Sequence, residues 1–122
     1  MTHIFVFGSN LAGVHGAGSA RHALDNCGAE WGVGVGLRGS SYAIPTKDRN
    51  IRTMPLQAIE PYVSDFLTFA RGHPEMQFDV VAIGCGLAGY TPSQVAPMFA
   101  GAPDNCNLPR EFTLALAEAE RA

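Results

Sequence analysis

Short runs of apolar residues recur along the chain and alternate with stretches rich in glycine or polar residues. Runs of strand length that are rich in strand-forming residues predict strands at residues 3–7, 41–45 and 78–83. The first of these begins close to residue 1 and is closed by Gly8, Ser9 and Asn10, and we expect it to be central in its sheet. Residues 31–39 alternate glycine with apolar side chains, which fits either a weak extended segment or a loop packed by Trp31.

Helical patterns fill the intervals between the predicted strands. The clearest spans residues 56–71, where apolar side chains recur every three or four positions, as in an amphipathic helix. Pro61 lies inside this span, so the regular part could begin at residue 56 or only at the proline. Gly28 is suited to follow one further helix and Thr91 to cap another. These additional helices are predicted at residues 19–26, 92–99 and 109–122, and residues 100–107 are predicted to form a loop.

Strands that alternate with helices indicate a small three-layer α/β fold with a largely parallel sheet. We expect residues 1–122 to form one domain, because no linker or internal repeat divides them. Ligands of such sheets bind at the carboxyl ends of the strands. Three loops follow predicted strands and fall at that edge: residues 8–18, 46–49 and 84–90.

Composition narrows the range of functions. A net charge of −3 argues against general affinity for a nucleic-acid backbone or an anionic membrane, but it allows a small phosphorylated ligand. Three widely spaced cysteines without a CxxC pair disfavour both a disulfide framework and a zinc site, so no metal and no cofactor are expected. No secretory signal and no long apolar span is recognisable, which favours a cytoplasmic setting. An apolar stretch at residues 112–117 is compatible with a homodimer.

The stretch FDVVAIGCGLAGY, residues 78–90, carries the clearest functional signal. It runs from a predicted strand through a glycine-rich loop to the start of a helix at Thr91 or Pro92. Free backbone N–H groups and the positive end of a helix dipole form an anion site, usually for phosphate. The alternative is a tight turn that uses glycine only for its backbone freedom. The loop LAGVHGAG at residues 11–18 repeats the layout, which favours a ligand site.

These residues resemble macrodomains, the module that binds ADP-ribose, and the chain is similar to small phage-associated macro-like proteins. GSN and HGAGSARHAL resemble the family's first ligand loop, and IGCGLAGYTPSQVAPM resembles its second. YAIPTK, residues 42–47, is similar to the segment that carries the lysine nucleophile in the branch that removes ADP-ribose from glutamate or from a modified DNA base. The resemblance covers roughly residues 4–100 and implies a macrodomain-like fold.

The resemblance implies a role for each matching residue. Asn10 would hydrogen-bond the distal ribose, Tyr90 would cover that ribose, and Lys47 would be the catalytic nucleophile or would pair with phosphate. Backbone N–H groups of both loops would hold the diphosphate. The implied ligand-binding residues are Gly8, Ser9, Asn10, Gly16, Ala17, Gly18, Gly84, Cys85, Gly86, Leu87, Gly89 and Tyr90. Nucleic acid would be a partner only as an ADP-ribosylated substrate.

The residues leave hydrolase activity open. Ala88 stands where the hydrolase branch carries an acid, and Asp48, the neighbour of Lys47, is expected to point to the opposite side of an extended segment. Cys85 could be a nucleophile if the loop lowered its pKa, with His15 or His22 as the base, or it could be a buried apolar residue. Three hypotheses follow: a binder of ADP-ribose or a related nucleotide diphosphate, a non-catalytic interaction protein with the same fold, and a hydrolase that uses Cys85 or Lys47 on another small molecule.

Overall fold

The computed structural model describes residues 2–121 and contains a five-stranded sheet of order β2-β3-β1-β4-β5. The strands are β1 (Thr2–Asn10), β2 (Gly36–Arg38), β3 (Ser41–Lys47), β4 (Met76–Val80) and β5 (Cys106–Asn107). β1 pairs in parallel with β3 and β4, and β4 with β5, whereas β2 is antiparallel to β3. The expectation of a largely parallel sheet with β1 in its middle is confirmed.

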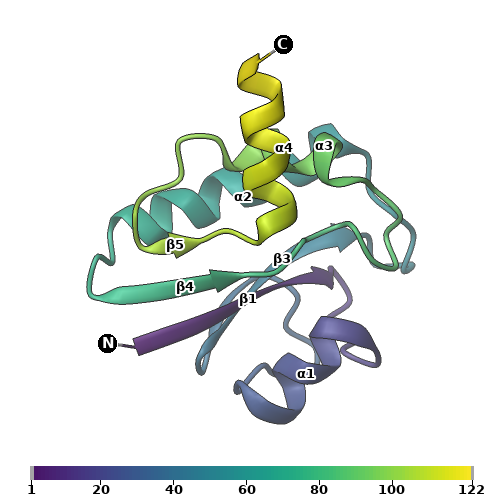
Figure 1. Cartoon of the computed structure of the whole chain (residues 1–122). Coiled ribbons are helices and arrows are strands. Elements are labelled where there is room, and N and C mark those ends of the chain that lie inside the picture. Colours follow the sequence, from purple (N-terminus) through teal and green to yellow (C-terminus); the bar gives the residue numbers. More distant parts are fainter. Residues whose placement is uncertain (1, 122) are drawn as a thin grey trace.

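Helices cover both faces of the sheet, so the fold has three layers (Figure 1). Helix α1 lies on one face, and α2, α3 and α4 lie on the other. The helices are α1 (Gly18–Asn26), α2 (Leu56–Arg71), α3 (Pro92–Val95), which continues as the 3-10 helix η1 (Ala96–Phe99), and α4 (Arg110–Arg121). A small three-layer α/β fold was predicted from the sequence and is confirmed.

The alternation of side chains along β1 builds two separate hydrophobic cores. Ile4 and Val6 point into the larger core, which α2, α3 and α4 cover. Phe7 points to the opposite face, into a smaller core with Ala20 and Ala23 of α1. Because small alanines face the sheet, α1 can pack closely, and its N-terminus lies at the carboxyl end of β1.

The sequence predicted the span of α2, residues 56–71, and left open whether its regular part begins at Leu56 or at Pro61. The helix begins at Leu56 and continues through Pro61. An amphipathic face explains this result, because Ile59, Val63 and Phe66 are fully buried and hold the helix on the sheet. The predicted helix at residues 92–99 changes to a 3-10 helix at Ala96, beside Pro97, which lacks a backbone donor.

Other boundaries differ from the predictions because the sheet, not the local pattern, decides where strands end. β1 extends through Gly8, Ser9 and Asn10, which pair with β3 instead of closing the strand. β4 ends at Val80, since Val81 donates the last bond to Val6 and the chain then turns. The predicted loop at residues 100–107 contains strand β5, which pairs with β4. Predicted helical residue 122 lies outside the described residues.

Within residues 2–121, no helix is long and apolar enough to cross a membrane. The same part of the chain contains no cluster of three or more His, Cys, Asp or Glu residues that could hold a metal ion.

Candidate ligand-binding cleft

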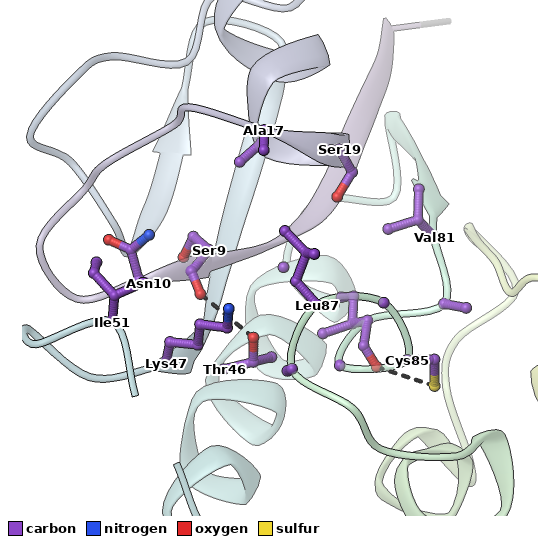
Figure 2. Close-up of a pocket in the computed structure, with 18 of the residues that line it drawn as sticks. Ser9, Asn10, Ala17, Ser19, Thr46, Lys47, Ile51, Val81, Cys85 and Leu87 are labelled. Carbon is purple, nitrogen blue, oxygen red and sulfur yellow. Dashed lines mark hydrogen bonds between the residues drawn. The ribbon is translucent and has the colours of Figure 1, made fainter. Parts of the chain in front are cut away.

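A cavity of about 550 Å³ opens at the carboxyl ends of β1 and β3, the edge at which the sequence places its three loops. Its walls come from the loop after β1, the start of α1, the end of β3 with the loop that follows, and the segment after β4 (Figure 2). The lining residues are Gly8, Ser9, Asn10, Val14, Gly16, Ala17, Gly18, Ser19, Ala20, Thr46, Lys47, Ile51, Val81, Ala82, Ile83, Gly84, Cys85, Gly86, Leu87, Ala88 and Glu111. A volume of this size accommodates a small organic ligand.

The first loop is held by its own polar groups. The Asn10 amide donates to the Val14 carbonyl oxygen (2.8 Å) and accepts the Val14 N–H (3.0 Å). Ser9 Oγ donates to the Gly34 carbonyl oxygen, and Gly32 N–H donates to Gly13 O (2.8 Å). The polar side chains of Ser9 and Asn10 therefore close the loop and attach it to residues 31–36.

Helix α1 begins at Gly18 without a side-chain cap, and its N-terminus lies in the wall of the cleft. The backbone N–H groups of residues 16–20 donate no hydrogen bond within the described chain. Unpaired donors at a helix N-terminus, together with the positive end of the helix dipole, favour an anionic ligand group.

The second loop turns tightly and leaves another set of donors unpaired. Its turns are closed by two bonds, from Tyr90 N–H to Gly84 O (2.8 Å) and from Gly89 N–H to Gly86 O (3.0 Å). The N–H groups of Gly86, Leu87 and Ala88 donate to no acceptor in residues 2–121. Both glycine loops thus bring free backbone donors to the same cleft.

The start of α3, which the sequence suggested as part of the anion site, lies elsewhere. Neither Thr91 nor Pro92 lines the cleft, and the Thr91 N–H donates to the Gln94 side chain (2.9 Å). The first turn of α3 is therefore satisfied by its own residues, a capping-box arrangement. Donors on this side of the cleft belong to the loop and not to the helix.

Two glycines of the cleft are required neither by backbone geometry nor by packing. Gly16 and Gly86 both have φ outside the left-handed region, and a Cβ added at either would have no heavy atom within 4 Å. Gly84 differs, because its φ of 78° itself favours glycine. At Gly16 and Gly86 the absence of a side chain leaves open space and exposed backbone at the cavity wall, which suits the close approach of a ligand.

Two charged residues, Lys47 and Glu111, are among the lining residues of the cleft. Lys47 belongs to the end of β3, and within the described residues it forms no salt bridge. Figure 2 places Lys47, Asn10 and Ile51 at one end of the cleft and Val81 and Ser19 at the other. Glu111, from the first turn of α4, is the acidic residue among the lining residues described.

Asp48, the other charged candidate that the sequence offered, lies outside the cleft lining. Asp48 Oδ1 accepts the N–H groups of Asn50 (2.8 Å) and Arg52 (3.0 Å), so this carboxylate organises its own loop. Arg38 pairs with Glu30 on the surface, at 3.2 Å. Ala88 does line the cleft, at the position where the resemblance expects an acid.

The surroundings of Cys85 disfavour a reactive thiolate. Burial raises the pKa of the Cys85 thiol, and the negative charge of Glu111 raises this pKa further. The thiol also donates a weak bond to Ile83 O (3.6 Å). His15, one of its two candidate bases, is fully buried within the first loop, where Nε2 lies 3.0 Å from both Glu30 O and Val33 O, and neither His15 nor His22 lines the cleft.

Of the predicted site residues, the fold brings all but two to the cleft. Gly89 and Tyr90 do not line it, because the Tyr90 hydroxyl turns away and donates to Met54 O. Ten lining residues were not among the predicted site residues: Val14, Ser19, Ala20, Thr46, Ile51, Val81, Ala82, Ile83, Ala88 and Glu111. The position of Ile51 beyond the end of β3 was an available signal, whereas Glu111 offered none, because α4 is remote in sequence from both loops.

Comparison with known proteins finds no matching family model, no matching curated protein and no matching solved structure.

Proposed function

We propose that the protein binds ADP-ribose or a related nucleotide diphosphate in this cleft. The main support for this proposal is the pair of glycine-rich loops that line one cavity of about 550 Å³. Each loop has unpaired backbone N–H groups. Diphosphate oxygens satisfy such donors without needing a net positive protein. Apolar lining residues, including Val14, Ile51 and Leu87, suit the uncharged remainder of a nucleotide. The resemblance of both loops to macrodomain ligand loops supports the same ligand.

Lys47 is proposed as the cation that pairs with the diphosphate. Its side chain lines the cleft and has no acidic partner among the described residues, so its charge is available to a ligand. Ala88 stands where the resemblance expects the acid of a hydrolytic pair, and the Asp48 carboxylate accepts two N–H groups of its own loop. We therefore favour binding over turnover.

The primary test is a calorimetric titration of ADP-ribose into the purified protein, with AMP and NAD as comparison ligands. We expect ADP-ribose to bind with micromolar affinity and more tightly than AMP, because AMP lacks the diphosphate. If none of the three ligands binds, the proposal is wrong.

A glycine substitution tests whether the second loop holds the diphosphate. Gly86→Val places a side chain in open space at the cavity wall, and we expect at least a tenfold loss of affinity with little change in thermal stability. Gly72→Val is the matched control, since Gly72 lies at the end of α2, outside the cleft, and has room for a Cβ. Unchanged affinity of Gly86→Val would remove the second loop from the site.

Lys47→Ala separates binding from catalysis. As a phosphate clamp, Lys47 contributes a charge-assisted hydrogen bond, so its loss should weaken ADP-ribose binding about tenfold or more. ADP-ribosylated protein and DNA should be assayed with the same variant. Loss of turnover with affinity retained would instead identify Lys47 as a nucleophile.

A further inference from the structure

Ile51 is the one non-glycine residue of the described chain that has a positive φ, at 62°. In this left-handed conformation the Cβ of an L-residue crowds its own backbone, and a branched Cβ makes the crowding worse. Glycine and asparagine adopt this conformation most readily. The chain has an asparagine at the preceding position, Asn50, but an isoleucine at position 51. The chain thus places a β-branched residue where local backbone preference disfavours one.

The surrounding loop holds Ile51 in this conformation. Ile51 N–H donates to Asp48 O (3.1 Å), and Asp48 N–H donates to Arg52 O (2.8 Å). The Asp48 carboxylate accepts N–H groups on both sides of Ile51. Thr53 Oγ1 donates to Ala88 O (3.0 Å), which attaches the loop to the second glycine loop. The conformation is therefore fixed by several bonds and is not a feature of a loose loop.

Packing in the protein core does not account for the isoleucine. Ile51 is 43% exposed and belongs to neither hydrophobic core. It does line the cleft, at the end that holds Lys47 (Figure 2). Residues in a strained backbone conformation, without core packing that compensates for the strain, are commonly found at ligand sites.

We infer that Ile51 is a specificity-determining residue whose side chain packs against the organic group attached to the diphosphate beside Lys47. This inference rests on the proposed function and adds to it an apolar contact with the sugar or base. A ligand surface placed there would cover apolar area that is exposed without it. The left-handed backbone places Ile51 in the lining of the cleft.

The test compares affinity with stability in variants that the backbone tolerates. Ile51→Asn suits the left-handed conformation and lacks the apolar side chain, whereas Ile51→Val keeps most of it. Val35→Asn is the matched control, since Val35 is 45% exposed and lies outside the cleft lining. ADP-ribose affinity is measured by calorimetry, and stability by the thermal unfolding midpoint.

We expect Ile51→Asn to weaken ADP-ribose binding about fivefold to tenfold without a fall in unfolding midpoint. Ile51→Val should lose less affinity, and Val35→Asn none. If wild-type protein binds ADP-ribose and Ile51→Asn binds it equally well, the inference is wrong while the proposed function stands. A larger fall in midpoint for Ile51→Asn than for Val35→Asn would show that Ile51 serves folding, and would also overturn it. Absence of binding to the wild type would overturn both.

Discussion

Glu111 and Cys85 form a pair that depends entirely on the fold, since 26 positions separate them along the chain. The carboxylate enters the cleft wall from the first turn of α4, where its charge also suits the helix dipole. Its charge opposes ionisation of the thiol, and partial burial opposes it more strongly. Both effects lower the thiolate fraction of Cys85, although the residue stands in a glycine loop that lines the cleft.

Alkylation of Cys85 should therefore be slow at neutral pH. Because the pKa of the Cys85 thiol is raised, less thiolate is present at any given pH than in an ordinary cysteine, so the iodoacetamide rate should rise only at more alkaline pH. Glu111→Gln removes the negative charge, lowers the pKa of Cys85 and should shift the rate profile to lower pH. Peptide mass spectrometry distinguishes Cys85 from the other two cysteines.

Glu118→Gln provides the control for this profile, because Glu118 lies on the same helix but outside the cleft lining. Equal profiles for Glu111→Gln and wild type would mean that the carboxylate does not act on the thiol.

Among the elements, the short strand β5 directly follows Asn105, whose side chain fixes the start of the strand by hydrogen bonds. The Asn105 amide nitrogen donates to the carbonyl oxygens of Ala70, His73 and Met76, at 2.9, 3.0 and 3.2 Å. These carbonyls belong to the end of α2, the following turn and the start of β4. Asn105 thereby joins three segments that the sequence pattern treats separately.

Asn105→Ala should lower the free energy of unfolding by about 2 kcal/mol, because partly buried carbonyl groups lose their donor. Asn105→Asp should cost more, since an ionised carboxylate donates no hydrogen bond and its oxygens would face carbonyl oxygens. Asn107→Ala is the control and should change stability by less than about 0.5 kcal/mol, because its bond to Asp79 is exposed. Urea unfolding measures all three, and similar losses for Asn105→Ala and Asn107→Ala would contradict the assignment.

For the whole molecule, stability is concentrated on the face of the sheet that α2 covers. Phe66 is fully buried and lies against Tyr42, Phe78 and Phe99, with ring centroids 5.0, 5.4 and 6.5 Å away. The opposite face, under α1, is packed mainly by alanines around Phe7. The cleft lies at the carboxyl edge of the sheet, between these two packed faces.

Phe66→Ala should remove about 3–5 kcal/mol from the free energy of unfolding, through lost burial and the cavity left behind. Trp31→Ala, at a large aromatic residue that is 60% exposed, should cost less than about 1 kcal/mol. Chemical denaturation of both variants tests the difference. Comparable losses would mean that Phe66 is not at the centre of the core.

The sequence predicted much of the fold, because its main elements have local signals. The span of helix α2 and its end were predicted, since its amphipathic face lies within the segment and Gly72 directly follows it. β5 was missed because two residues carry no periodicity, and β4 was predicted too long because its end is set by pairing with β1. Strand ends depend on the neighbouring strand, which a local pattern does not contain.

The candidate site was predictable to the same extent. Parallel strands bring their carboxyl ends to one edge, so the glycine loops and Lys47 were expected to meet from their order alone. The sequence by itself thus determined the fold class, the central strand and the two loops of backbone donors. Tertiary structure alone decided that His15 and Tyr90 turn away, that Glu111 enters the cleft, and that Ile51 is held left-handed beside Lys47. These side-chain positions depend on contacts between distant segments, which only the folded chain brings together.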